Sequence, residues 1–232
     1  MPQPSATAFT EAWIRRFAAS ASATEAELTA LDQQVGDGDF GTNLVAGLDA
    51  TLRRLDGQGE PAGRSPLECA ADAFLDEVGG TSGPLFGLLL QELAAAVAEG
   101  GDRLDPAALA AGAGGGLAAI QRVGEARVGD KTLVDALAPA CDALASYARG
   151  QGTDPAEALA RAAQAAWTGV GDTARLTARR GRASYVGDRA AGVPDPGAVG
   201  IGLLFSAAEE TVTRLAPFLT DGPENPPERR TA

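Results

Sequence analysis

The sequence predicts an all-α protein, and three observations support that fold class. Apolar residues make up 45% of the 232 residues and are mostly Ala and Leu, whereas aromatic residues make up only 5%. This balance favours packed helices over pleated sheet. Apolar residues also recur at helical spacing, and the breaks between the periodic stretches fall at Gly, Pro and Asp clusters. We expect one domain over residues 1–220.

Eight stretches have the periodicity of an amphipathic helix. In chain order they are 6–31, 41–56, 66–78, 82–99, 105–122, 130–149, 155–178 and 198–218. The fifth contains the glycine-rich run 112–116, which costs about 1 kcal/mol per Gly relative to Ala and indicates either close helix packing or a local break. Residues 221–232 are Pro-rich, charged and without periodicity, so we expect a disordered tail there.

Composition excludes several classes of function. The net charge of -12 argues against nucleic acid and anionic membranes as partners. The sequence has neither an apolar run of about 20 residues nor a signal-peptide layout, so we expect a cytoplasmic protein. It has no His, which excludes Ser/His catalysis, His-ligated zinc and a phosphohistidine relay through this chain. Cys69 and Cys141 are expected to be buried free thiols.

Three carboxylates gather in the first dense break, where Asp32, Asp37 and Asp39 fall within eight residues. The intervening glycines permit sharp turns that can aim the three side chains at one point. Like charges so close repel unless a cation lies among them, and oxygen ligands suit magnesium bound to substrate phosphates. The alternative is a helix end followed by an ordinary Asp-Gly turn. An EF-hand calcium loop does not fit, because its ligand spacing and closing Glu are missing.

The second break, residues 78–87, leads into an apolar helix. Thr81 or Ser82 can cap that helix and Pro84 can occupy its first turn, which leaves backbone amides free to bind a phosphate. A plain helix cap explains the same residues equally well.

The third break, residues 124–133, offers three features. Asp130 is placed as an N-cap, Lys131 could meet a phosphate, and Gly124 could let a flat ring approach the backbone. A solvated turn is the alternative.

The fourth region, residues 177–189, holds four arginines in an acidic chain. Guanidinium groups bind phosphate through paired hydrogen bonds, so this cluster indicates anion recognition. A basic helix end that complements the helix dipole is the alternative.

Together the four regions resemble the L subunit of dihydroxyacetone kinases, which is similar to the C-terminal domain of single-chain ATP-dependent dihydroxyacetone kinases. The matching segments, in order from about Leu31 to Ala198, are LDQQVGDGDFGTN, GGTSGPLFG, VGDKTLVDALAPA and GRASYVGDR followed by DPGA. The resemblance implies an antiparallel barrel of eight amphipathic helices with the nucleotide site at one end.

The resemblance also implies roles for individual residues. Asp32, Asp37 and Asp39 would hold Mg²⁺, expected as two ions, that bridge the phosphates of ADP or ATP. The residues expected to border the phosphates are Phe40, Gly41, Thr42, Asn43, Thr81 and Ser82. Those expected around the adenosine or closing over it are Gly124, Leu133, Arg182, Asp195, Pro196 and Gly197. The sequence departs from the family at one position, because Phe40 stands where His is usual, and this bears on the substrate.

The family's division of labour implies a partner. A K subunit or domain holds the ketose through its own histidine, which this chain cannot supply, while the L subunit presents the nucleotide. Mg²⁺ and Arg182 would stabilise charge on the transferring phosphoryl group. ATP either exchanges each cycle, or bound ADP is rephosphorylated by a phosphotransferase-system phosphocarrier subunit. The alternative function is a non-catalytic, ADP-loaded module that regulates a partner protein. The sequence leaves the oligomeric state open, a homodimer included.

Overall fold

The computed structural model of the chain describes residues 4–57, 63–181 and 183–219. These residues form ten α-helices, one 3-10 helix and no strand, which confirms the all-α prediction. The helices are α1 (Ala6–Val35), α2 (Phe40–Leu55), α3 (Pro66–Asp76), α4 (Ser82–Glu99), α5 (Pro106–Gly124), α6 (Val134–Arg149), α7 (Pro155–Thr173), α8 (Ala183–Val186), η1 (Gly187–Ala190), α9 (Pro196–Ser206) and α10 (Ala216–Leu219).

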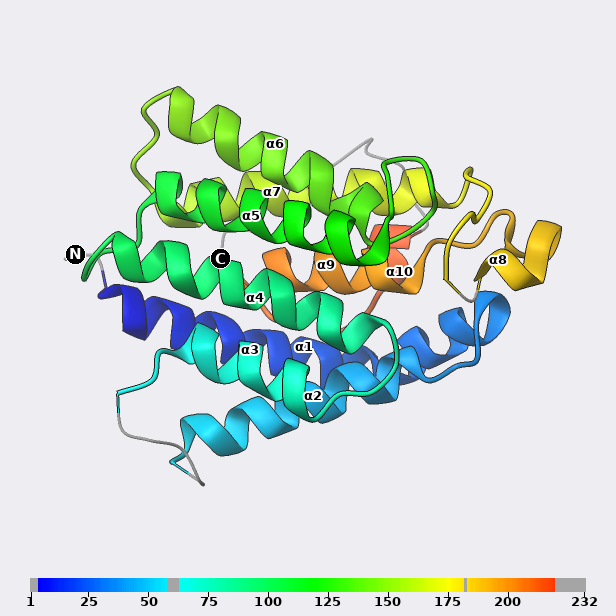
Figure 1. Cartoon of the computed structure of the whole chain (residues 1–232), viewed down its shortest axis with the longest axis horizontal. Coiled ribbons are helices and arrows are strands. Elements are labelled where there is room, and N and C mark those ends of the chain that lie inside the picture. Colours follow the sequence, from blue (N-terminus) through cyan, green and yellow to red (C-terminus); the bar gives the residue numbers. More distant parts are fainter. Residues whose placement is uncertain (1–3, 58–62, 182, 220–232) are drawn as a thin grey trace, which may run out of the picture.

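The long helices lie side by side, and their loops gather at the two ends of the molecule (Figure 1). Each of α1 to α6 packs against the next helix in the chain, and α9 packs against α1, α6 and α7. All residues of α9 are buried, so this helix lies inside the others. The expected tail, residues 221–232, falls outside the described residues. No helix in the described ranges is both long and apolar enough to cross a membrane.

Local signals explain where many helices begin. The helices α3, α5, α7 and α9 start at a proline that follows a Ser or Asp N-cap, and each cap side chain accepts a hydrogen bond from an N–H of the first turn. Proline suits this position because its missing N–H would have no intrahelical partner. In α3, Glu68 also accepts from the Ser65 N–H, which completes a capping box.

The glycine run in α5 reflects close packing, since the helix is continuous through it. A Cβ on Gly112 would lie 2.8 Å from the Leu93 Cα atom, and one on Gly116 would lie 3.0 Å from the Leu89 Cα atom. The glycines therefore let α5 approach the backbone of α4 more closely than larger residues would allow.

The predicted helix over 198–218 is wrong between residues 207 and 215, where the described chain is irregular. Side chains of α1 replace the helical hydrogen bonds there. Trp13 Nε1 donates to the Leu204 carbonyl, and Arg16 donates to the carbonyls of Ala207 and Ala208. Periodicity continues through this segment because it still packs apolar residues against the core. The other predicted bounds shift by a few residues: α6 begins at 134 and α7 ends at 173.

Candidate functional site

Eight helix ends meet at one end of the molecule: the C-termini of α1, α3, α5 and α7 and the N-termini of α2, α4, α6 and α9 (Figure 1). The four sequence regions singled out above are the connections at this end. The fold thus brings together segments that are as much as 165 residues apart in the chain, which is the separation of Asp32 and Gly197.

The acidic cluster lies between α1 and α2. Asp32 is buried in the last turn of α1, whereas Asp37 and Asp39 are exposed in the connection. One carboxylate oxygen from each residue lies within 4.8 Å of those of the other two. Gly38 has a φ of 80°, the left-handed region that favours glycine, and a Cβ on Gly36 would collide with the Asp32 carboxylate. The glycines are what allow the three carboxylates to meet.

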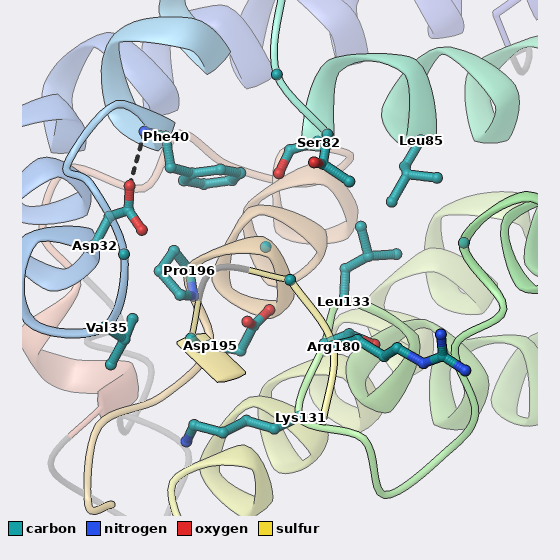
Figure 2. A pocket seen from close by; sticks show the side chains of 18 of the residues that line it. Asp32, Val35, Phe40, Ser82, Leu85, Lys131, Leu133, Arg180, Asp195 and Pro196 are labelled. Atoms are coloured by element: carbon teal, nitrogen blue, oxygen red, sulfur yellow. Dashed lines mark hydrogen bonds between the residues drawn. The ribbon is translucent and has the colours of Figure 1, made fainter. Parts of the chain in front are cut away.

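The electrostatics of the cluster favour a bound cation. Burial raises the pKa of Asp32 above its usual value, and the neighbouring charges of Asp37 and Asp39 raise it further, while the hydrogen bond from the Phe40 N–H opposes both. That N–H donates to Asp32 Oδ2 at 3.1 Å and fixes the carboxylate (Figure 2). A hard divalent cation would relieve the repulsion, and three convergent oxygen donors fit the preferences of Mg²⁺.

Phe40 contributes a backbone group to the cluster and a ring to the core. The ring is 5% exposed and lies 6.3 Å from the Phe86 ring, centroid to centroid. A Cβ on Gly200 would come within 2.8 Å of Phe40 Cζ, so α9 leaves room for the ring. The ring edge lines the pocket, and the Asp32 hydrogen bond needs only the backbone N–H.

A cavity of about 400 Å³ adjoins the acidic cluster (Figure 2). Most of the predicted site residues line it: Asp32, Asp37, Asp39, Phe40, Asn43, Thr81, Ser82, Gly124, Leu133, Asp195, Pro196 and Gly197. Lys131, suggested by the sequence as a phosphate contact, also lines it, and the lining residues without an individual predicted role are Val35, Gly36, Gly80, Leu85, Ile120, Ala126, Thr132, Val134, Arg180, Gly181 and Ala183. Polar and charged groups surround the aspartates, and apolar side chains from α4, α5 and α6 form the other part of the wall.

Two predicted residues, Gly41 and Thr42, do not line the cavity, and a third cannot be placed relative to it. A Cβ on Gly41 would lie 2.7 Å from the Glu25 carbonyl oxygen, so this glycine permits the close approach of α1 and α2. Thr42 is exposed, and its hydroxyl donates to Glu25 Oε1 at 3.3 Å. Arg182 lies outside the described residues. Their roles toward a ligand stay predictions.

The apolar part of the wall could hold a flat ring. Leu85 and Leu133 face each other across it (Figure 2). A Cβ on Gly124 would have only the Leu85 side chain near it, at 4.0 Å, so the backbone is open on the cavity side. Arg180 lines the cavity beyond Leu133, points away from Asp32, and pairs with Glu125 at 3.3 Å.

Two charged groups lie at the base of the cavity. Lys131 is 1% exposed, and its ammonium donates to the carbonyls of Thr173 and Val193 at 2.5 and 2.6 Å. Asp195 caps α9 through the Ala198 N–H at 2.8 Å. Burial raises the pKa of Asp195 to about 7, with Asp135 and Asp32 adding to the shift and Lys131 opposing it. The Lys131 ammonium is therefore engaged by backbone carbonyls rather than directed at a ligand.

The fold and the site define an all-α domain that carries an acidic, oxygen-only cluster beside a partly apolar cavity. The chain belongs to the DAK2 domain family, whose model matches residues 34–210. This confirms the resemblance to the L subunit of dihydroxyacetone kinases.

The curated relatives are named as kinases or as subunits of kinases. An ADP-binding subunit DhaL of a PEP-dependent dihydroxyacetone kinase from Listeria innocua is 32% identical over 200 residues, covering 86% of this chain and 93% of that subunit. An L-erythrulose 1-kinase from Mycolicibacterium smegmatis is 40% identical over 192 residues, covering 82% of this chain but 33% of that kinase. The chain thus spans about a third of the length of the longer kinase.

Solved structures agree with the sequence comparison. The dihydroxyacetone kinase of C. freundii in complex with AMP-PNP and Mg²⁺ matches with a TM-score of 0.64 and 27% identity, covering 89% of this chain and 34% of that chain. Its native form matches with a TM-score of 0.65 over the same share of this chain.

Proposed function

We propose that this chain is the nucleotide-binding subunit of a kinase that phosphorylates dihydroxyacetone or a related small ketose held by a partner K subunit. The observation that carries the proposal is the convergence of Asp32, Asp37 and Asp39 within 4.8 Å beside a cavity of about 400 Å³. Oxygen ligands for Mg²⁺ and a partly apolar cavity are the two things that a Mg-nucleotide needs. The DhaL relative, named as an ADP-binding subunit and similar over nearly its whole length, supports this assignment.

The residues of the chain divide the binding task. Asp32, Asp37 and Asp39 would hold Mg²⁺, which when bound neutralises phosphate charge. Ser82 and Thr81 border the same part of the cavity at the start of α4, where helix N–H groups favour anions. Leu85, Leu133 and Gly124 would accept the adenine ring. Catalysis then consists mainly of positioning and charge stabilisation, and Arg182 is the predicted cation on the transferring group.

A calorimetric titration tests the nucleotide site directly. ADP is titrated into nucleotide-stripped protein with and without Mg²⁺, beside Asp37→Ala/Asp39→Ala. We expect Mg²⁺-dependent binding of about one ADP per chain that the double variant loses, because it keeps only one of the three carboxylates. Glu99→Ala/Asp102→Ala removes the same charge from exposed positions at the other end of α4 and should bind like the wild type. No binding by folded wild-type protein would refute the proposal.

A second assay separates an enzyme subunit from an ADP-loaded regulatory module. The ADP-loaded chain is mixed with a cognate K subunit and dihydroxyacetone, and is supplied with either ATP or a phosphorylated phosphotransferase-system carrier. Ketose phosphate formed with the carrier alone indicates rephosphorylation of bound ADP, and formation with ATP alone indicates exchange. Tight ADP binding without transfer from either donor would favour the regulatory module.

A further inference from the structure

The connection between α7 and α9 begins and ends at points that lie close together. The Gly192 N–H donates to the Ala174 carbonyl at 2.9 Å, and the Asp195 N–H donates to Thr173 Oγ1 at 2.9 Å. These two bonds join the first and last residues of the connection, and we call residues 173–174 and 192–195 its neck. The connection includes α8 and η1, and in the sequence it carries Arg182.

The Lys131 side chain links the two segments of the neck. Its ammonium donates to the Thr173 carbonyl at 2.5 Å and to the Val193 carbonyl at 2.6 Å, and so binds one residue from each side of the neck. The Thr173 carbonyl is at the C-terminus of α7, where it also accepts from the Leu176 N–H at 3.2 Å and where the helix dipole favours a cation. Figure 2 shows Lys131 extending below Asp195 and away from Ser82 and Leu85.

The buried Lys131 side chain lies within the electrostatic influence of two carboxylates. Burial lowers its pKa, but the carboxylates of Asp195 and Asp135 oppose that shift. The two carbonyl acceptors add hydrogen bonds that only a donor can satisfy. The side chain is 1% exposed, so removing the ammonium would leave both carbonyls without this partner in a buried place.

The turn that presents Lys131 is held by its own network. Lys131 has a φ of 61°, an unfavourable conformation for a residue with a side chain. Asp135 stabilises the turn by accepting from the N–H groups of Gly129 and Thr132 at 2.5 and 2.8 Å. The same turn also contacts the connection directly, because the Arg179 N–H donates to the Asp130 carbonyl at 3.0 Å.

We infer that Lys131 is a positioning residue that fastens the neck of the α7–α9 connection and thereby fixes the Asp195-Pro196-Gly197 wall of the cavity. The fastening itself follows from the contacts above. Its effect on nucleotide binding rests on the proposed function. The sequence suggested a phosphate contact for Lys131, and the structure assigns its ammonium to the backbone of the neck instead.

Hydrogen exchange of the nucleotide-free protein tests the fastening. Lys131→Met keeps the length of the side chain but removes the donor. We expect exchange in peptides covering 174–181 and 190–195 to accelerate about tenfold or more, because two charge-assisted bonds are lost. The control variant is Leu159→Ala, which destabilises α7 near the end opposite to the neck and so reports a general loss of stability. Unchanged exchange at the neck in folded Lys131→Met would overturn the inference.

Ligand kinetics supply a second readout. With a cognate K subunit, Lys131→Met should raise the rate of ADP dissociation about tenfold and leave the KM for the ketose unchanged, since Asp195 at the end of the neck lines the proposed nucleotide cavity and the ketose is held by the K subunit. Loss of ADP binding without faster exchange at the neck would instead show a direct ligand contact and contradict the inference. If wild-type protein binds no ADP, the proposed function fails while the exchange test still decides the fastening.

A second variant keeps the test decisive if Lys131→Met does not fold. Lys131→Gln removes the charge and shortens the side chain by one atom, but keeps a neutral amide donor. Faster exchange confined to the neck would support the inference. An unchanged neck in this folded variant would contradict it, because the neck would then hold without the ammonium that bridges the carbonyls of Thr173 and Val193.

Discussion

At the scale of single residues, burial divides the acidic cluster into unequal parts. Asp32 is 8% exposed and is oriented by the Phe40 N–H, whereas Asp37 and Asp39 face solvent. Without a cation, the charge on Asp32 is both desolvated and repelled by its neighbours. The ionised Asp32 side chain therefore destabilises the metal-free site, and a bound cation would offset that destabilisation.

Asp32→Asn is expected to stabilise the metal-free protein and to weaken Mg-ADP binding. Asn keeps the oxygen that accepts from the Phe40 N–H but removes the charge, so the Tm at pH 8 should rise by about 2–4 °C. Mg-ADP affinity should fall by about 100-fold, because a ligand carboxylate is lost. Thermal unfolding and calorimetry measure the two effects. A lower Tm without metal would contradict the prediction.

Asp195 predicts a pH dependence of stability in the nucleotide-free protein. Its pKa is about 7 when folded, against an ordinary value of 3.8 for an aspartate side chain, so the folded state binds one more proton between these values. The stability contributed by this group is fully present below the lower value and is lost as the pH rises through about 7. Asp195→Asn, which can still cap α9, should therefore stabilise the protein at pH 8 and have little effect at pH 4.

Urea unfolding at several pH values measures this difference. Asp154→Asn changes the equivalent cap of α7 at an exposed position and serves as the control. The increase in the free energy of unfolding caused by Asp195→Asn should grow with pH, whereas the effect of the control substitution should not. If Asp195→Asn stabilised the protein equally at pH 4 and pH 8, the pKa of Asp195 would not be raised by folding, and the prediction would be contradicted.

At the scale of elements, two nearby glycines of α5 affect the stability of the protein in opposite directions. A Cβ on Gly116 would lie 3.0 Å from the Leu89 Cα atom of α4, whereas a Cβ on Gly114 would have nothing within 4 Å. One glycine is required by packing and the other only weakens the helix.

The pair gives a matched prediction. Gly114→Ala should raise the free energy of unfolding by about 0.5–1 kcal/mol, the difference in helix propensity. Gly116→Ala should lower it by about 1–3 kcal/mol, since the added methyl forces α4 and α5 apart. Chemical denaturation of both variants checks the signs. Equal effects would mean that the interface of α4 and α5 yields to the added methyl.

At the scale of the whole molecule, the sequence predicted what is determined locally. Helix periodicity and caps depend on near neighbours, so the order of α1 to α7 followed from them. The break after α9 could not be predicted, because Arg16 and Ala207, which form it, are 191 residues apart. The expected barrel closure and single domain stay predictions.

In the candidate site, too, the residues close together in the sequence could be predicted, whereas those placed by distant contacts could not. Asp32, Asp37 and Asp39 were found because they lie within eight residues. Leu85 and Ile120 were missed, since helical periodicity assigns them to a buried face whether that face meets the core or a cavity. The partners of Lys131 lie 42 and 62 residues away, and nothing in the local pattern indicates them.

The burial of α9 has a consequence for synthesis. This helix fills the interior and its first residues form a wall of the cavity, yet it is the last long helix to leave the ribosome. Until it emerges, α1, α2, α6 and α7 lack the helix against which they pack in the folded protein. The cavity therefore cannot be completed until α9 has been made, and apolar surface that α9 later covers is exposed during that interval.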